Sequence, residues 1–441
     1  MAQWNITTQD YLNQERSLFE VNGVATRDGK IVDEYNRFPV SINSDAFGRT
    51  RVSNPLTLFD SSHRYRDNNL WDSLVIGTGS TVGFATTAGL VNMTVGVGST
   101  ASVIRETTKV FSYQPGKSLL TMNTFVLNPP KENLRQRVGY FGDDNGIYFE
   151  VDGTTAYFVE RSLSLGTETR VSQSNWNIDK LDGTGVSGIT LDLTKAQILW
   201  MDIEWLGLGN VRLGFIINGK FIHAHTFQHA NIIQSTYITT ASLPLRYEIS
   251  NTGITTSAST LKQVCSTVIS EGGYELRGLQ QSISTPVITP VDLPTPRGTY
   301  YPVISIRLKA PINGQPDRLD AIVIMTALSL MGTGNGPQYN WQIRASATTS
   351  GGIWVSAGDD SAVEYKLDGG TVSGGRVLAS GFLTSANQSS QSVDILKEAL
   401  FKFQLERNGL TKTPYEITLV AASDTAGADI FASMDWEEIS R

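Results

Sequence analysis

Three of the chain's four histidines, His223, His225 and His229, lie in the single stretch GKFIHAHTFQHAN. Imidazole nitrogens are common zinc ligands, and a metal site needs several of them on one surface. Asp202 and Glu204 stand two positions apart in the preceding predicted strand, AQILWMDIEW, where alternate side chains share a face. One interpretation of these residues is therefore a zinc site in which the carboxylates complete the ligand set.

The local register argues against that site. The Asn-Gly pair at 218–219 lies between two apolar runs and predicts a two-residue type I′ hairpin. In the register that follows, His223 lies opposite Gly214 and His225 lies opposite Arg212. A fixed guanidinium beside His225 opposes the binding of a second cation. We therefore expect neither a metal nor a cofactor at this face.

The same sheet face has three other interpretations. It serves as a solvated face or a subunit interface, as a shallow groove for a ligand such as a sugar, or as a catalytic site. For catalysis, Asp202 and Glu204 would lie roughly 7 Å apart, between the separations of retaining and inverting glycosidases. A depolymerase thus stays an alternative to our expectation that the chain is not an enzyme. The residues that we place on this face are Trp200, Asp202, Glu204, Arg212, Phe221, His223 and His225.

The composition and the turn pattern predict β structure. Charged residues make up 17% of the chain, below the ~25% of an average soluble domain, and glycine is abundant at 41 residues. Turn sequences such as DDNG (143–146) and DG (152–153) flank short runs in which apolar and polar side chains alternate. We predict a mainly β chain with two antiparallel β-sandwich or jelly-roll domains, the first with a concanavalin-like pattern.

The domain limits follow from changes in composition. We place the first sandwich at 46–275 and the second at 300–441. The residues between them, 276–299, are rich in proline, which favours an extended linker because proline disturbs both helices and ladders. The prolines are Pro286, Pro290, Pro294 and Pro296.

Residues 1–45 differ from the rest of the chain. They are polar, with scattered large apolar side chains that such a short segment cannot bury by itself. We predict an attachment arm that becomes ordered on a partner, anchored by Trp4, Phe19 and Phe38.

Several classes of protein are disfavoured by the bulk sequence. The net charge is -7 and no run of Lys or Arg occurs, so we expect no nucleic-acid partner. No stretch of about 18 apolar residues occurs, so we expect no insertion into a membrane. Cys265 is the single cysteine, so no intrachain disulfide forms and stability must come from packing or from assembly.

Two stretches of the sequence carry a resemblance to a known family. The first holds AFGRTRVS (46–53), PLTLFDSSHRY (55–65) and Trp71. The second is SVDILKEALFKFQLERNGLTKTPYEITLV (392–420), with DWEEIS near the end of the chain. Both are similar to segments in virion structural proteins of tailed bacteriophages, especially marine cyanophages and their relatives.

The resemblance implies a non-enzymatic virion protein. Its expected place is the tail, at the baseplate periphery or in a fibre, with the arm at 1–45 as the attachment. The alternatives are a capsid decoration protein and a host-receptor module that binds a cell-surface glycan. The implied partners are other virion proteins and further copies of the chain in a homo-oligomer, with a trimer as one option.

Overall fold

The chain divides into two compact units, Met1–Val52 and Ser53–Arg441. In the first unit, the described elements are the short antiparallel strands β1 (Thr26–Arg27) and β2 (Lys30–Ile31). Trp4, Phe19 and Phe38 lie outside the described residues, so the anchoring role of the arm stays a prediction. The computed structural model describes residues 26–27, 30–31, 54–273, 275, 277–294, 298–310, 318–333, 337–367, 370–385, 391–393 and 403–440.

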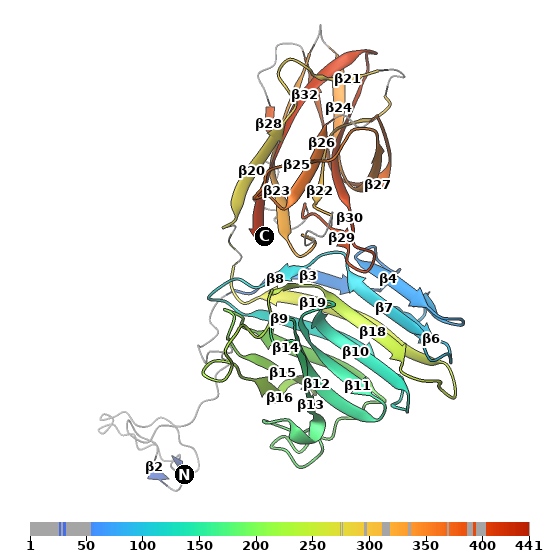
Figure 1. The fold of residues 1–441 in the computed structure, drawn as a ribbon, viewed down its shortest axis with the longest axis vertical. Coiled ribbons are helices and arrows are strands. Elements are labelled where there is room, and N and C mark those ends of the chain that lie inside the picture. Colours follow the sequence, from blue (N-terminus) through green and yellow to red (C-terminus); the bar gives the residue numbers. More distant parts are fainter. Residues whose placement is uncertain are drawn as a thin grey trace, which may run out of the picture. The chain divides into compact units, whose positions relative to one another are not determined.

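Two antiparallel sheets in the second unit enclose the first core (Figure 1). The seven-stranded sheet has the order β13 (Thr167–Ser172), β12 (Thr155–Ser162), β11 (Gly146–Asp152), β10 (Leu134–Phe141), β18 (Leu245–Asn251), β7 (Ser102–Thr107) and β4 (Trp71–Ile76). The eight-stranded sheet has the order β16 (Lys220–Phe227), β15 (Val211–Ile217), β14 (Ala196–Ile203), β9 (Leu119–Val126), β19 (Ser259–Ser270), β6 (Leu90–Val95) and β5 (Thr81–Ala85), and β3 (Leu56–Ser62) pairs with β19. A small pair, β8 (Phe111–Ser112) with β17 (Ser242–Leu243), and a 3-10 turn at Gln173–Asn175 complete this part.

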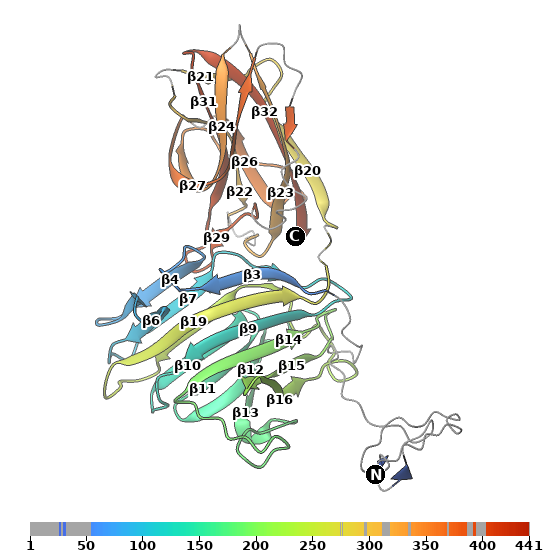
Figure 2. The same cartoon turned by 180° about the vertical axis from the view of Figure 1, so that it is seen from behind.

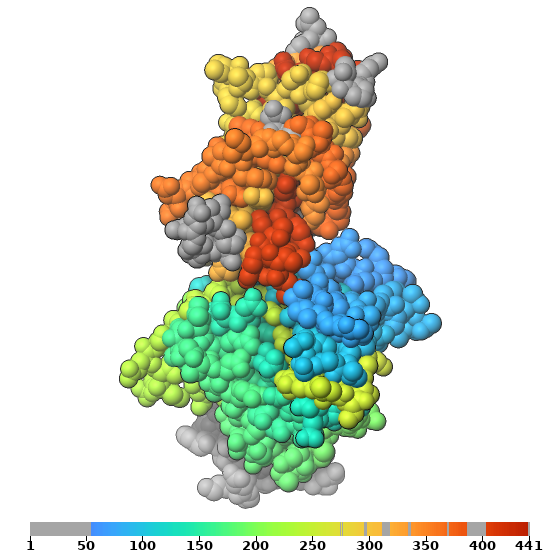
Figure 3. All heavy atoms as spheres, turned by 45° about the vertical axis from the view of Figure 1, so that its right-hand side comes forward, coloured from blue at the N-terminus to red at the C-terminus, as the bar shows by residue number. Residues whose placement is uncertain are grey.

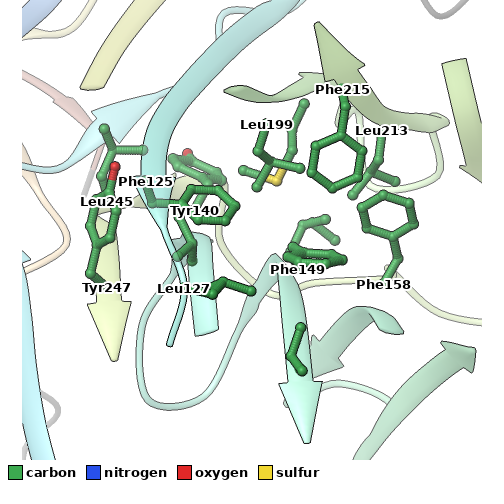
Figure 4. Packing of buried hydrophobic residues seen from close by; sticks show 14 of the residues in the cluster. Phe125, Leu127, Tyr140, Phe149, Phe158, Leu199, Leu213, Phe215, Leu245 and Tyr247 are labelled. Atoms are coloured by element: carbon green, nitrogen blue, oxygen red, sulfur yellow. The ribbon is translucent and has the colours of Figure 1, made fainter. Parts of the chain in front are cut away.

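The first core lies between these two sheets (Figure 4). It forms because alternate residues of each strand point inward and are apolar, as in β11, where Ile147, Phe149 and Val151 are buried. Phe149 packs edge-on against Phe215 of the opposite sheet, with ring centroids 5.2 Å apart. The predicted antiparallel sandwich is confirmed here by the sheet order itself.

Two further antiparallel sheets enclose a second core drawn from residues between 291 and 436. The five-stranded sheet contains β20 (Leu279–Ser284), β32 (Ala428–Ser440), β23 (Ile322–Gly332) and β28 (Gln391–Val393), and β21 (Val291–Leu293) pairs with β32. The six-stranded sheet has the order β25 (Val355–Ser356), β26 (Val363–Leu367), β22 (Tyr301–Leu308), β31 (Glu416–Ser423), β24 (Gln338–Ser350) and β27 (Thr371–Thr384). A hairpin of β29 (Arg407–Asn408) and β30 (Thr413–Pro414) lies apart from them.

The proline-rich stretch differs from the prediction of an extended linker. Residues 279–284 and 291–293 form β20 and β21, which both pair with β32, and Val291 and Leu293 are buried in the second core. Proline removes a backbone donor only at its own position. The prolines fall in the loop between the two strands and after β21, so the ladder forms around them. This stretch therefore belongs to the second core, while the predicted limits 46–275 and 300–441 stay predictions.

Candidate functional site

The predicted hairpin is present at β15 and β16, which adjoin β14 in the eight-stranded sheet (Figure 2). Asn218 and Gly219 have φ angles of 52° and 75°, and a type I′ turn needs positive φ at both positions. Next to the turn, Ile217 pairs with Lys220 and Gly214 pairs with His223, as predicted.

The predicted register fails one step further along, because a β-bulge shifts the pairing of β15 and β16. His225 lies opposite Leu213 and not opposite Arg212. The extra residue is Ala224, whose carbonyl accepts backbone N–H groups of Ile178 and Asp179. The bulge turns His225 to the other side of the sheet, so the prediction that His223 and His225 share a face is wrong.

His225 points into the first core. It is 4% exposed, and its ring lies 4.7 Å from that of Phe227 and 6.2 Å from that of Phe158. The backbone N–H of Asn177 donates to Nδ1 at 3.3 Å, so Nδ1 is the acceptor and the neutral ring carries its proton on Nε2. Burial, followed by His223, lowers the pKa of His225 to about 4. This histidine is therefore a neutral core residue at physiological pH.

Trp200 and its neighbours form the outward side of the hairpin. The Trp200 ring lies 5.5 Å from Phe221 and 5.8 Å from His223, and its Nε1 donates to the Ile222 carbonyl at 3.3 Å. A Cβ at Gly214 would meet the carbonyl oxygen of Ile222 at 1.9 Å and that indole nitrogen at 3.0 Å, so glycine allows the close approach of both. Trp200 is only 6% exposed, whereas Phe221 is 55% exposed. Phe221 is thus the side chain that this part of the face offers to a partner.

Asp202 and Glu204 do not form an open catalytic pair. Asp202 is 1% exposed and accepts Nε of Arg212 at 3.1 Å across the two strands. Glu204 is fully buried beyond the end of β14, where its backbone N–H donates to the carbonyl of Asn210. A polysaccharide has no access to either carboxylate in this arrangement. Their geometry therefore gives the depolymerase interpretation no support.

His229 occupies a buried polar site that the sequence did not reveal. Its Nδ1 lies 2.5 Å from the carbonyl of Gly209 and its Nε2 lies 2.6 Å from Oε2 of Glu160, while the ring stacks on Tyr237 at 4.0 Å. A carbonyl cannot donate, so Nδ1 carries a proton, and a second proton must lie between Nε2 and the carboxylate. This bond ties the loop after β16 to β12 of the opposite sheet.

The three histidines therefore do not come together as ligands of one zinc ion. His223 faces outward, with Nε2 2.8 Å from Oγ1 of Thr226, whereas His225 faces inward and His229 bonds to Glu160. Within the described ranges, no group of three His, Cys, Asp or Glu side chains is placed to hold a metal ion. Likewise, none of the described segments is a helix long and apolar enough to cross a membrane.

The pairing register defines two uncharged rows on the outward face of the eight-stranded sheet. They run across β19, β9, β14, β15 and β16, one row passing through Trp200 and the next through Ile198. Burial, and next the charge of Arg212, lowers the pKa of His223, which keeps that ring neutral at pH 7. We call these rows the uncharged band; its residues are Thr267, Met122, Trp200, Gly214, His223, Cys265, Thr124, Ile198, Ile216 and Phe221.

The outward face of the seven-stranded sheet has the opposite character. Arg137 donates Nε to Glu150 at 2.7 Å and Nη1 to Glu248 at 3.3 Å, and the other oxygen of Glu150 accepts Nε of Arg170 at 2.9 Å. Glu150 is only 1% exposed, so these charges are largely removed from water. We call the linked set the charge network; its members are Asp152, Arg170, Glu150, Arg137, Glu248, Arg246 and Glu106.

Aromatic rings lie beneath the arginines of this face. The guanidinium of Arg137 lies 5.2 Å from the centre of the Tyr148 ring, and that of Arg161 lies 5.3 Å from it. Tyr148 and Phe141 are fully buried although both point away from the first core. The arginine stems therefore act as a second layer that covers this face with the chain's own side chains.

The charge network continues into the second core through Arg407. Its Nη2 donates to Glu106 at 3.2 Å, its Nη1 to the carbonyl of Thr107 at 2.6 Å, and its backbone N–H to the carbonyl of Thr108. Burial raises the pKa of Glu106, and the charges of Arg407 and then Arg246 oppose that rise. These three bonds attach β29 to the end of β7 and to Thr108, the residue that follows it.

Neighbouring residues extend this attachment. Thr108 donates Oγ1 to Glu406 at 2.7 Å, and Tyr415 donates its hydroxyl to Asp72 at 2.8 Å. Figure 3 shows the red segment that follows residue 403 against the blue strands near β4 and β7. We call this contact the brace; its residues are Glu406, Arg407 and Tyr415 with Asp72, Glu106, Thr107 and Thr108.

Sequence reasoning missed the charge network and the brace. Runs such as LRQRVGYF were visible as strands, but the pairing of Arg137 with Glu248 joins positions 111 residues apart. A single sequence gives no signal for that partner.

Comparisons with known proteins leave the family open. No protein-family model matches the chain, and no curated protein matches it. Among solved structures, peanut lectin with a bound peptide is similar at 10% identity and a TM-score of 0.31, over 49% of this chain and 98% of that chain. A protein of unknown function from Shewanella oneidensis is similar at 9% identity and a TM-score of 0.34, over 52% and 92%. A mixed linkage glucan GH16 protein from Bacteroides ovatus is similar at 10% identity and a TM-score of 0.33, over 48% and 99%.

Proposed function

We propose that this chain is a non-enzymatic structural protein of a bacteriophage virion, most closely associated with the tail. In this role the two β cores act together as one spacer, because the brace joins them. What supports the proposal is the place of the two segments that resemble virion proteins. Segment 392–420 contains Glu406, Arg407 and Tyr415 of the brace, and the first segment ends at Trp71, next to Asp72.

The residues of the first segment are architectural. Trp71 donates its indole N–H to Oγ of Ser61 at 2.8 Å and packs edge-on against Phe59 at 6.1 Å. Both rings lie in the first core, close to the strand that supplies Asp72 to the brace. The described residues of the strings that carry the resemblance thus build a connection between the two cores.

The test is the composition of purified particles. We expect the chain to remain with phage particles after density banding and a high-salt wash, and to localise to the tail in an electron-microscopic reconstruction. A chain that is abundant in the infected lysate and absent from washed particles would refute the proposal. Localisation to the capsid surface would replace the tail by the decoration role.

The arm gives a second test of the same proposal. Deleting residues 1–45 removes Trp4, Phe19 and Phe38 and leaves every described strand from β3 onward. We expect a protein that folds normally and does not join the particle. Normal incorporation of the truncated chain would show that the anchor lies elsewhere.

Glycan binding is a second candidate, favoured by one aromatic site. Tyr157 is half-buried at the outward edge of the seven-stranded sheet, with Arg170 4.3 Å from its ring centre and Asp152 paired to that arginine at 2.9 Å. An aromatic ring beside a carboxylate and a guanidinium suits a hydroxyl-rich ligand. Binding of the chain to a host-glycan array should then be weakened more by Tyr157→Ala than by Trp200→Ala, because Trp200 is only 6% exposed. An array with no hit for the wild-type chain would remove this candidate.

A further inference from the structure

The uncharged band has an unusual strand at its centre. In β9, the inward side chains include Thr121 and Asn123, both fully buried, whereas the outward side chains include Leu120 and Met122. An antiparallel sheet with one face on a core and one in water has its polar side chains on the outer side. The inward side also holds Leu119 and Phe125, so apolar side chains lie on both sides of β9, as in a strand that is covered on both faces.

Neighbouring strands continue the apolar surface. Ile198 of β14 is 36% exposed, and Phe221 at the edge strand is 55% exposed. Both lie in the row that runs from Cys265 through Thr124 and Ile216, and no member of this row carries a charge. Contiguous apolar area of a few hundred Å² on a folded protein marks an interaction site.

Charge lies only along the margins of the band. On one side Asp202 is neutralised by Arg212, and on the other side Lys262 follows the band along β19. At the end of the row through Trp200, the exposed Asp60 of β3 lies opposite Thr267. An uncharged centre with a polar margin is the usual anatomy of a protein interface.

The size of the surface fits a subunit contact. Five strands at about 4.8 Å spacing, and two rows at about 6.8 Å along each strand, give about 330 Å² for the band itself. One flanking row on each side raises the area to about 650 Å². A stable interface buries about 800 Å² on each partner. The band and its margins thus approach the area that a stable pair needs.

We infer that the uncharged band is the contact between two copies of this chain, packed sheet against sheet. The partner must present a flat, uncharged, apolar surface of matching size, and the chain itself presents one. Two copies bring no charge into the centre of the contact, because the band's own residues are uncharged at pH 7 and the acidic side chains of Asp202 and Asp60 lie at its margins. A contact of this kind is self-complementary, as closed two-fold assembly requires.

The test is the oligomeric state of the full chain, measured by sedimentation between about 1 and 100 µM, a span that brackets the affinity of an ordinary interface. We expect the wild-type chain to self-associate, and Phe221→Glu and Ile198→Glu to weaken that association at least ~tenfold, since each places a charge inside the apolar centre. Ile254→Glu is the matched control, because Ile254 is 73% exposed and lies outside the band. Melting temperatures show that each variant is folded.

Cys265 supplies an independent readout in the wild-type chain. It is the single cysteine and lies in the same row as Phe221. We expect its reaction with a thiol reagent to slow as the protein concentration rises, and to lose that dependence in Phe221→Glu. A wild-type chain that stays monomeric throughout overturns the inference. So does self-association that Phe221→Glu and Ile198→Glu leave unchanged, or that Ile254→Glu disrupts equally.

Discussion

The two outward faces of the first sandwich differ in what covers them. On the seven-stranded sheet, Arg137 meets two carboxylates and lies over Tyr148, so a fully buried ring sits on the solvent side of the sheet. On the eight-stranded sheet, Met122 and Ile198 remain partly exposed and Phe221 is 55% exposed. The first face is largely covered by the chain's own side chains, whereas the second keeps exposed apolar side chains.

This difference separates stability from association. A buried charge network contributes little net free energy when it is intact, but it is costly to break, because the remaining charges lose their partners in a dry environment. An exposed apolar side chain contributes little to its own fold, but it becomes important when a partner covers it. Substitutions on the first face should therefore change unfolding, and those on the second should change assembly.

The largest effect should come from Arg137→Ala. The variant removes the hydrogen bonds of Arg137 to Glu150 and to Glu248 at once. Glu150 then keeps Arg170, and Glu248 keeps the longer contact with Arg246 at 3.5 Å. We expect the free energy of unfolding to fall by ~3–5 kcal/mol, because two hydrogen bonds between buried charged groups are lost together. Urea denaturation measures it. Lys220→Ala, at an exposed position of β16, is the control and should change the value by less than ~0.5 kcal/mol. A loss below ~1 kcal/mol for Arg137→Ala would show that water screens the network.

The continuation of the network into the second core should have a smaller effect. Arg407→Ala removes the donors to Thr107 and Glu106, but Arg246 still pairs with Glu106 at 3.3 Å. We expect a loss of ~1.5–3 kcal/mol, the range for hydrogen bonds to charged groups. Calorimetry should then show the two cores melting in separate steps. A single, unchanged transition would mean that the cores are coupled by other contacts.

The dependence of stability on pH should differ between the inward His225 and the outward His223. The pKa of His225 is about 4 in the folded chain and 6.5 when unperturbed, so the unfolded chain binds more protons between these values. The contribution of His225 to the free energy of unfolding should fall as the pH drops from about 6.5 to about 4, and stay level outside that window.

Replacing that histidine should remove its share of the pH dependence. Between pH 7.5 and pH 5, we expect His225→Phe to lose ~1–2 kcal/mol less than the wild-type chain. His223→Phe is the matched control on the outward face and should change the slope less. His63, buried with its pKa lowered to about 4 by burial and by Arg105, keeps part of the slope in both variants. Equal slopes in the wild-type chain and His225→Phe would contradict the assigned environment.

Local patterns were sufficient to predict strands and turns, but the expected half-buried character of β14 is wrong, because Trp200 and Asp202 on its outward face are buried as well. Asn218 and Gly219 specify their turn because both tolerate positive φ, and the first pairs of the hairpin follow from it. The bulge at Ala224 was not predictable, because its carbonyl bonds to Ile178 and Asp179, which are far away in sequence. A shift of one position moves a side chain to the other face of the sheet, so the bulge places His223 and His225 on opposite faces.

The site was less predictable than the fold for the same reason. Trp200, Asp202 and Arg212 lie on one face as expected, since period two and one turn fix them. Whether a carboxylate is reachable depends on what lies above it, and the sequence near Asp202 carries no information about that. The prediction of an extended linker for the proline-rich stretch was wrong for another reason. Composition shows where the prolines are, but it does not show which residues between them pair with another strand.

The smallest expected effect on stability tests the uncharged face most directly. Phe221→Thr keeps a residue with good strand propensity at an edge position that is 55% exposed, so it should change the free energy of unfolding by less than ~0.5 kcal/mol at low protein concentration. Urea denaturation at about 0.1 µM, well below the range in which ordinary interfaces form, measures the isolated chain. A loss above ~1.5 kcal/mol would show that Phe221 packs within its own chain as a buried residue does. The two faces would then differ in chemistry but not in role, and the case for a second copy on the uncharged band would lose its basis.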